Sequence, residues 1–494
     1  MTDDDPDAAG GDTAVRRDRF TGGPAREFLS SLAADAAIFE ADLAVDRAHV
    51  VMLAERGIVD EAVAGEILAA LDEVEAAGHG ALPDGEDVHE AIETAVIDRI
   101  GPDGGRMHTA RSRNDEVATC IRYRLREDLL DAAEATVAAR EALVEVAREH
   151  AGTLMPGYTH LQPAQPTTVG HYLLSYEGGL ARDTARLLAA YDRVNRSPLG
   201  AAAFAGTPFG IDRDRTAELL GFDGTVRNSM DAASARDFLA EAATALATLA
   251  TTLSGLAEDL ILFSKDGVVE LADAYASTSS IMPQKKNPDT LELTRAVAGD
   301  ATGELTGLLT TLKGLPRAYN RDLQRAHPHT FRAVDAVVEA SSIAAGAVAT
   351  ADWNAELLAD EADDGFATAT GIADLLAMAG LPFRTAHEVV ALAAEEAEHS
   401  DDGVTAAVLD AAAENVLGES LFAYVDEKSV ASALDPAESV ASRDSVGGPA
   451  PGTVDASIKT AREAVATDND ALNARRETLS AAATRRQREV DQYV

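Results

Sequence analysis

Apolar residues recur at helical spacing over three long stretches of the chain. Residues 115–150 contain neither Pro nor Gly, and an apolar stripe occupies every fourth position at Val117, Ile121, Leu125 and Leu129. Residues 233–263 carry leucines that step by three and four, at Leu246, Leu249, Leu253, Leu256 and Leu260. Residues 333–351, rich in Ala and Val, are a third candidate helix. Helices of this length reach on the order of 40 Å, so we expect them to pack lengthwise in a bundle and between subunits.

Turn residues divide this pattern into three parts. Helical patterning begins near Phe28, after an acidic, Gly-rich lead-in, and a cluster of Gly, Pro and Asp at residues 101–105 ends the first region. After Trp353 the pattern changes to shorter helices, broken at residues 380–382 and 447–449. We predict an N-terminal helical domain (residues 1–108), a central long-helix bundle (109–355) and a small C-terminal helical domain (356–494).

The composition supports an all-α protein. Hydrophobic residues make up 46% of the 494 positions but aromatic residues only 4%, which favours helices over strands. No apolar run approaches the roughly 20 residues that span a bilayer, and the acidic N-terminus lacks the basic segment of a signal peptide. We therefore expect a soluble, cytoplasmic protein. The single cysteine, Cys120, lies in an apolar helical stretch and is expected to be a core residue rather than a nucleophile.

The net charge of −42 changes the picture of possible partners. It opposes binding to nucleic acid or to anionic membranes, and it equally opposes a dianionic substrate. An excess of Asp and Glu with few Lys is typical of proteins adapted to high salt, whose negative charge lies over the whole surface. An anionic substrate would then need a locally basic site. Because lysines are rare in this chain, the adjacent Lys285 and Lys286 indicate where that site lies.

A polar segment at residues 277–289 carries the strongest chemical signal. It contains four consecutive hydroxyl residues including Ser279, a Pro break, two ammonium groups and the amide of Asn287, and Glu292 follows it. The segment has neither helical nor strand periodicity, so we expect a polar loop that displays hydrogen-bond donors. Such a loop suits a dicarboxylate.

Two further polar segments lie beside predicted long helices. Donors at Ser112, Arg113 and Asn114 precede the first long helix, where the helix macrodipole favours an anion, although Ser112 or Asn114 could simply cap the helix. Thr159 and His160 lie in an irregular, Pro-bounded turn, which favours a functional His over a structural one. Two more segments, at residues 228–237 and 319–324, are by themselves explained by helix capping or are uninformative.

Together these five segments resemble those of the argininosuccinate lyase family, within the fumarase/aspartase superfamily. The run Gln-Lys-Lys-Asn-Pro-Asp at residues 284–289 carries the resemblance most specifically, and the similarity extends through residues 198–200 and 447–451. The resemblance implies a homotetramer with a central helix bundle and active sites shared between three subunits. It also implies reversible β-elimination of argininosuccinate to arginine and fumarate, in arginine biosynthesis, without metal or organic cofactor.

The resemblance further implies roles for individual residues. Ser279 would be the base on a mobile loop, Thr159 and His160 the proton-donating side, and Glu292 the carboxylate that orients His160. The residues alone leave open which of Ser279 and His160 removes the proton. The carboxylates on the fumarate side would be held by Lys285, Asn287, Ser112, Asn114 and Thr159, and Arg113 is a further substrate-binding residue. Further substrate-binding candidates, mainly near the arginine half, are Ser31, Asp35, Arg236, Tyr319 and Gln324.

Three positions differ from the pattern common in the family. Glu116, Thr278 and His327 stand where relatives often have Gln, Gly and Lys. The first adds negative charge near a proposed anion site, and the second stiffens the loop that carries the base. The third makes one substrate contact weaker or dependent on pH.

Two alternative functions stay open at this point. Another fumarate-releasing lyase, acting on adenylosuccinate, malate or aspartate, would share the fumarate-side machinery. No basic or aromatic set suited to a purine nucleotide is evident, which counts against adenylosuccinate. A non-catalytic, crystallin-like structural homologue is the other alternative, and the presence of Ser279, His160, Lys285 and Glu292 counts against it.

Overall fold

The computed structural model describes residues 24–397 and 403–494. It confirms the all-α fold, because the strands in this part of the chain are short and pair only two at a time. The predicted lead-in before residue 24 lies outside the described residues.

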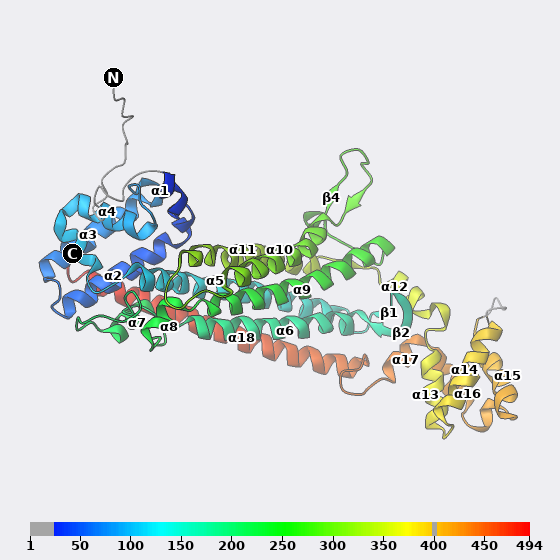
Figure 1. Cartoon of the computed structure of the whole chain (residues 1–494). Coiled ribbons are helices and arrows are strands. Elements are labelled where there is room, and N and C mark those ends of the chain that lie inside the picture. Colours follow the sequence, from blue (N-terminus) through cyan, green and yellow to red (C-terminus); the bar gives the residue numbers. More distant parts are fainter. Residues whose placement is uncertain (1–23, 398–402) are drawn as a thin grey trace.

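Long helices run side by side through the centre of the molecule (Figure 1). They are α5 (Arg113–Glu149), α6 (Val169–Val194), α9 (Asp237–Asp266), α10 (Asp289–Leu312), α11 (His327–Ala349) and α18 (Pro451–Val490). The three predicted long helices correspond to α5, α9 and α11. The predicted start of α9 lies too early, because Ala235 and Arg236 leave the helical conformation and separate it from α8 (Ser229–Ser234).

The apolar stripes predicted from the sequence form the bundle core. In α5, Ile121, Leu125 and Leu129 are at most 1% exposed, and the five leucines of the α9 seam are at most 2% exposed. Helix α5 packs against α6, α11 and α18, and α9 packs against α6, α10 and α11, so neighbouring helices of the bundle cover both stripes. Cys120 is fully buried in the same core, as expected.

Shorter helices gather at the two ends of the bundle (Figure 1). At one end lie α1 (Pro24–Leu29), η2 (Ala34–Ile38), α2 (Phe39–Glu55), α3 (Glu61–Ala77), η3 (His79–Ala81), α4 (Val88–Ile100), η4 (Pro102–His108) and α7 (Arg213–Leu220). At the other lie α12 (Ala355–Asp363), η7 (Asp364–Phe366), α13 (Ala369–Met378), α14 (Phe383–Ala397), α15 (Ala406–Leu417), η8 (Leu421–Ala423), α16 (Glu427–Leu434) and α17 (Pro436–Ala441). Helices α13 to α16 enclose a separate hydrophobic core.

Helix α18 does not fit the expectation of short helices after Trp353. It has 40 residues and runs back along α5 and α6 to α7 and α2, so the C-terminus lies beside the N-terminal helices (Figure 1). Its buried apolar positions recur at the helical steps of three, four and seven, at Val454, Ile458, Ala461, Val465, Leu472, Leu479 and Ala482. The division of the chain at residues 108 and 355 stays a prediction.

Two helical segments, Asp237–Asp266 and Arg321–Thr350, are long and apolar enough to cross a membrane, which corrects the expectation that no segment approaches this limit. Their composition has another explanation, because both are core helices of the bundle. Only 44% of each apolar window is buried within one chain. The neighbouring α10 also leaves Leu293 and Leu309 exposed, at 70% and 50%. Helix α10 therefore exposes two large apolar side chains in a single chain.

Short antiparallel ribbons hold the polar segments. They are β1 (Leu154–Thr159) with β2 (Gln162–Thr168), β3 (Val269–Glu270) with β6 (Asp352–Trp353), and β4 (Ser277–Thr278) with β5 (Lys286–Asn287). The first contains several prolines, which a two-stranded ribbon tolerates because each strand has a free edge. The chain between β4 and β5 projects away from the bundle (Figure 1).

Candidate active site

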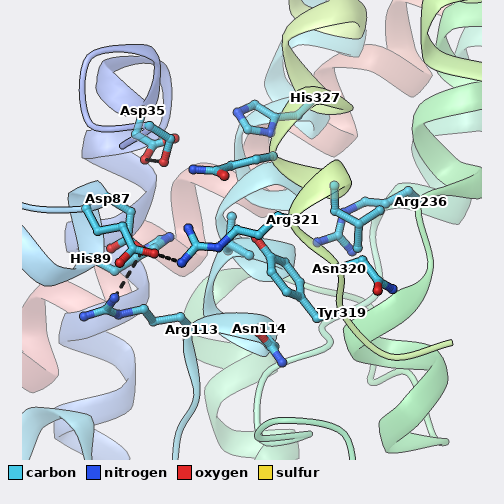
Figure 2. Close-up of a pocket in the computed structure, with 15 residues that line it drawn as sticks. Asp35, Asp87, His89, Arg113, Asn114, Arg236, Tyr319, Asn320, Arg321 and His327 are labelled. Atoms are coloured by element: carbon cyan, nitrogen blue, oxygen red, sulfur yellow. Dashed lines mark hydrogen bonds and ion pairs between the residues drawn. The ribbon is translucent and has the colours of Figure 1, made fainter. Parts of the chain in front are cut away.

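A cavity of about 360 Å³ opens between the N-terminal helices and the bundle (Figure 2). Its walls come from η2, the start of α4, the start of α5, the residue before α9, and the segment that contains η6 (Arg321–Arg325). Seven of the predicted substrate-binding residues line it: Ser31, Asp35, Arg113, Asn114, Arg236, Tyr319 and Gln324. Tertiary packing thus brings together residues that lie far apart in the sequence.

One wall of this cavity is acidic. The Ser31 hydroxyl donates a 2.6 Å hydrogen bond to Asp35, which is only 3% exposed. Burial raises the pKa of Asp35, and the hydrogen bond from Ser31 opposes that shift. Asp87 approaches Arg113 at 3.4 Å, and Glu86 forms an ion pair with Arg321, which reaches across the cavity (Figure 2). Asp35, which forms no ion pair within the described residues, suits a cationic group of a ligand.

The opposite side carries a buried cation, Arg236, which is 3% exposed. Its Nη1 donates to the carbonyl oxygen of Ala235 at 2.8 Å, and its Nε has no hydrogen-bond partner. No carboxylate within residues 24–397 and 403–494 forms an ion pair with it. Burial lowers the pKa of Arg236 to about 10, so the group is still charged at neutral pH. An uncompensated buried guanidinium favours an anionic ligand.

Ser112 caps the start of α5. Its side chain accepts a 3.4 Å hydrogen bond from the backbone N–H of Asn114, and its own N–H donates to Asp115 at 3.0 Å. These contacts form a capping box, so the capping alternative is confirmed for Ser112, which does not line the cavity. Asn114 does line it, and its side-chain amide donates to the carbonyl oxygen of Ala203 at 3.1 Å.

The segment that contains Arg236 also includes a helix cap, as its sequence suggested. The Asn228 side chain accepts the backbone N–H of Asp231 at 3.0 Å and caps α8. Arg236 itself makes no side-chain cap at the start of α9. Capping and ligand binding therefore belong to different residues of one segment.

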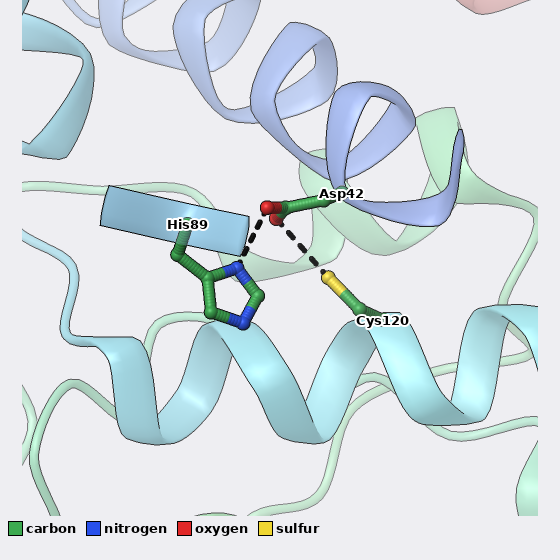
Figure 3. Close-up of side chains that lie close together, drawn as sticks. All are labelled: Asp42, His89 and Cys120. Atoms are coloured by element: carbon green, nitrogen blue, oxygen red, sulfur yellow. Dashed lines mark hydrogen bonds and ion pairs between the residues drawn. The ribbon is translucent and has the colours of Figure 1, made fainter. Parts of the chain in front are cut away.

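Sequence reasoning missed a buried charge network behind the cavity. His89, a cavity residue, contacts Asp42 at 2.7 Å, and the Cys120 thiol donates to the same carboxylate at 3.3 Å (Figure 3). Arg111 pairs with Asp46 at 2.6 Å and with Glu116 at 2.9 Å. The only available signal was several charged residues within apolar helical stretches, a pattern also produced by solvated helix faces.

The network explains one departure from the family pattern. Glu116 is 1% exposed and faces the buried Arg111, not the cavity; burial raises the pKa of its carboxyl well above the usual value, and Arg111 opposes that shift. Burial alone would lower the pKa of His89, but Asp42 and Glu116 raise it to about 10, so the imidazole is protonated at neutral pH.

Two groups in this network have atoms close enough to share a metal ion. The first group is Asp42, His89 and Cys120, and the second is Asp42, Asp46 and Glu116. Within each group the possible ligand atoms lie within 4.8 Å of one another. Their oxygen atoms already accept hydrogen bonds from Arg111, His89 and Cys120. Two buried cations, Arg111 and protonated His89, balance most of the negative charge. We therefore interpret the network as a set of buried ion pairs behind the cavity wall.

Thr159 and His160 lie at the turn of the β1–β2 hairpin. Thr159 pairs with Gln162, so His160 and Leu161 are the two turn residues, with φ of 57° and 59°. Two left-handed residues define the type I′ turn that fits the twist of a hairpin, although neither residue is Gly. The side chain of His160 is exposed. Thr159 lines a different cavity, between this hairpin and the C-terminal helices.

The segment at residues 277–289 is a polar loop, as expected, apart from the short strands β4 and β5. The Ser279 hydroxyl oxygen accepts hydrogen bonds from the backbone N–H groups of Ile281 at 3.3 Å and Met282 at 3.1 Å. Lys286 pairs with Glu270 and Asp273, at 3.1 and 2.8 Å. The ammonium group of Lys285 has no partner in the described part of the chain. Lys285 and Glu292 are exposed, and Ser279 and Asn287 are partly so.

A single chain does not bring the predicted acid and base residues to the cavity. The β1–β2 hairpin and the loop at β4 lie away from the N-terminal helices that frame the cavity, and apart from each other (Figure 1). Seven predicted residues meet in the cavity, whereas Ser112 caps a helix and Thr159, His160, Ser279, Lys285, Asn287 and Glu292 lie elsewhere.

The chain matches two family models. One is described as lyase and covers residues 25–303, and the other, described as argininosuccinate lyase C-terminal, covers residues 366–441. Argininosuccinate lyase of Haloarcula marismortui is 67% identical over 483 residues, which cover 98% of this chain and 97% of the relative. That of Natronomonas pharaonis is 68% identical over 487 residues, with 99% and 98% covered. Both relatives come from halophilic archaea, in agreement with the acidic composition.

Solved structures share the fold. The crystal structure of EDDS lyase in complex with formate is 36% identical, with a TM-score of 0.87 and coverage of 95% of this chain and 96% of that one. Class II fumarase from Schistosoma mansoni, at 16% identity, has a TM-score of 0.70 over 86% of this chain and 96% of its own, which shows the fold alone. With the motifs in order and identity above 60% over nearly the whole length, the chain belongs to the argininosuccinate lyase family, whose members are lyases of the fumarase/aspartase superfamily.

Proposed function

We propose that this protein cleaves argininosuccinate reversibly to arginine and fumarate, as a cytoplasmic step of arginine biosynthesis. The observation that carries the proposal is the cavity of Figure 2, which presents carboxylates on one wall and the uncompensated Arg236 on the other. Such a cavity suits the arginine half of argininosuccinate, which carries both cationic and anionic groups. A solved EDDS lyase variant, 36% identical with a TM-score of 0.85, has bound fumarate, which supports the other half of the reaction.

Ser279 is the base of the proposed elimination. It removes a proton from the carbon next to a carboxylate, and the bond from the neighbouring carbon to the guanidinium nitrogen then breaks. The N–H groups of Ile281 and Met282 point at its oxygen and stabilise an alkoxide, and Lys285 adds an unpaired positive charge nearby in sequence. Such an alkoxide also requires that water be excluded when the site closes.

His160 and Thr159 supply the acid side. His160 protonates the departing nitrogen, and Glu292 orients its imidazole. The tight two-residue turn holds the His160 backbone in one conformation, which positions its side chain at the hairpin tip. Lys285, Asn287 and Asn114 bind the carboxylates of the fumarate half.

In this proposal the protein is a homotetramer, and three subunits contribute to each active site. The acid, the base and the cavity then come together from different chains. Two features support it. The predicted catalytic side chains are exposed or partly exposed and are separated within one chain, and the face of the bundle that carries α10 leaves Leu293 and Leu309 uncovered there. Pairing these faces would bury apolar area and would bring the segments of different chains together.

The first test is to offer the purified protein four substrates in concentrated KCl and to follow fumarate by ultraviolet absorption. Argininosuccinate, adenylosuccinate, malate and aspartate are supplied in parallel. We expect rapid fumarate release from argininosuccinate alone. Fumarate release from another substrate would support the elimination mechanism but assign a different substrate. No fumarate release from a well-folded protein would favour a non-catalytic homologue.

Shared active sites predict that two inactive variants restore each other. Asp35→Asn alters the cavity and Ser279→Ala alters the loop, so a mixed tetramer contains some sites with neither change. After dissociation and joint reassembly in KCl, we expect fumarate release well above that of either variant treated alone. Two different affinity tags verify that mixed assemblies have formed. Mixed assemblies without any gain in activity would show that each site belongs to one chain.

A further inference from the structure

Aromatic side chains gather where the β1–β2 hairpin joins the bundle. Aromatic residues make up only 4% of the chain, yet Tyr158, Tyr172, Phe263 and Trp353 meet there as one aromatic cluster. The ring centroid of Phe263 lies 5.4 Å from that of Tyr172 and 6.2 Å from that of Trp353. Tyr158 adds its ring at 6.3 Å from Phe263. Phe263 and Trp353 are buried, so the cluster ties the hairpin to the core of the bundle.

The backbone of the hairpin is irregular directly before Tyr158. The register of the two strands shifts between Pro156 and Tyr158, and such irregularities change the direction of a side chain relative to a regular strand. Gly157 lies within the irregularity, and a Cβ added to it would be 2.5 Å from a backbone oxygen of β2, so only glycine fits between the strands there. From this position the ring of Tyr158 reaches Phe263 of α9.

Tyr158 is the anchored side chain nearest to the hairpin tip. Helix α12 packs against β1 and α17 against β2, so the hairpin lies between the end of the bundle and the C-terminal helices (Figure 1). The hydroxyl of Tyr158 interacts with the carboxylate of Glu361 in α12. Within the described residues, no hydrogen bond, ion pair or ring contact joins the side chain of Thr159 or His160 to the rest of the chain. The position of the tip therefore depends on the contacts of Tyr158.

On the basis of the proposed function, we propose that Tyr158 is a positioning residue, whose ring on Phe263 fixes the direction of the hairpin tip and thereby places Thr159 and His160 in the assembled site. A two-stranded hairpin is marginally stable by itself, so its direction must come from packing on the bundle. The ring carries this role, because the carboxylate of Glu361 is partly exposed and its hydrogen bond competes with water. Tyr158 acts through its two neighbours and touches no reacting atom.

The first part of the test measures kcat and KM for argininosuccinate in concentrated KCl. Tyr158→Leu removes the ring, and Tyr158→Phe removes only the hydroxyl. We expect Tyr158→Leu to lower kcat by about ten- to a hundredfold, because a small displacement of the acid is costly, and to change KM by less than about threefold. Tyr158→Phe keeps the contact with Phe263 and should restore kcat to within a fewfold of wild type.

The second part of the test needs no substrate. Trp353 is the only tryptophan of the chain, is 4% exposed and belongs to the aromatic cluster, so its fluorescence reports how the cluster is packed. We expect Tyr158→Leu to move its emission to longer wavelength as water reaches the indole. Hydrogen exchange of the backbone N–H groups of residues 154–168, followed by mass spectrometry, should become faster in the same variant. Neither property should change in Tyr158→Phe.

Two further variants serve as control and second probe. Phe383→Leu is the matched control, because the ring of Phe383 is half exposed and lies 6.4 Å from that of His387, in α14 and outside both cavities. Its kcat should equal that of wild type. Phe263→Leu removes the same contact from the side of the bundle, and it replaces Tyr158→Leu should that variant fail to assemble. Removing both rings should cost no more than removing one, because the two act as a unit.

A Tyr158→Leu variant with the kcat of Phe383→Leu would overturn the proposal, as would an equal loss in Tyr158→Phe or unchanged hydrogen exchange of the hairpin. These results are separable from a failure of the proposed function. Wild type that releases no fumarate from argininosuccinate refutes that function, and fluorescence and hydrogen exchange still decide whether Tyr158 holds the hairpin. Wild type that releases fumarate, with unaltered kcat in Tyr158→Leu, refutes only the role of Tyr158.

Discussion

Replacement of Ser279 by alanine is expected to slow fumarate release by about a hundred- to ten-thousandfold, the contribution typical of a general base. The variant loses the oxygen that accepts the N–H groups of Ile281 and Met282, and with it the alkoxide that these groups would stabilise. The loop is exposed in the single chain, so folding should be unaffected. Initial rates with saturating argininosuccinate, together with circular dichroism and gel filtration, measure both outcomes.

Ser280→Ala is the matched control for that variant. Ser280 is the adjacent residue and is exposed, and its hydroxyl makes no hydrogen bond within the described residues. We expect its rate to stay within a fewfold of wild type. A Ser279→Ala rate equally close to wild type would remove Ser279 as the base and would leave that role to His160.

Arg111→Met is expected to lower the free energy of unfolding by about 3–5 kcal/mol, the usual loss when one partner of a buried ion pair is removed. The Arg111 side chain is 2% exposed, and the carboxylates of Asp46 and Glu116 are at most 2% exposed. Methionine fills similar space but leaves Asp46 without its ion-pair partner and Glu116 with only His89, at 3.7 Å. Urea unfolding at fixed protein and KCl concentrations, followed by circular dichroism, measures the difference.

Arg106→Met removes an ion pair of similar length from the surface. Arg106 pairs with Asp103 at 2.7 Å, and the two side chains are 51% and 55% exposed. Water and salt screen such a pair, so we expect a change of less than about 1 kcal/mol. Equal effects of the two substitutions would show that the Arg111 network does not stabilise the fold by buried charge pairing.

The local spacing of apolar residues predicts some of the long helices but not all of them. The stripe in α5 and the leucine seam in α9 were readable because helix formation depends on neighbouring residues and because an apolar face must be covered. Helix α18 also carries buried positions at helical spacing from Val454 to Leu479, so the prediction of only short helices after Trp353 was wrong although a stripe was present. That helix is held by packing on α5 and α6, which is information from elsewhere in the chain.

For the polar segments, the sequence likewise predicts the kind of chemistry but not the surroundings of each side chain. Their chemistry and their family membership could be read from residue types in order, because a motif such as the run at residues 284–289 is local. The cap formed by Ser112, the burial of Glu116 against Arg111 and the free nitrogens of His327 could not be predicted. Each depends on which distant side chains surround a residue, and a sequence does not display that environment.

The spacing of apolar residues was therefore sufficient for the all-α fold and for three of the long bundle helices, and the local polar motifs were sufficient for the family. Tertiary packing alone decided that Asp35, Arg236 and His327 share one cavity, and that Thr159 and Ser279 lie outside it within one chain. The physical reason is that burial and charge balance are collective properties. They are set by the contacts of helices far apart in sequence, and only folding brings those contacts into existence.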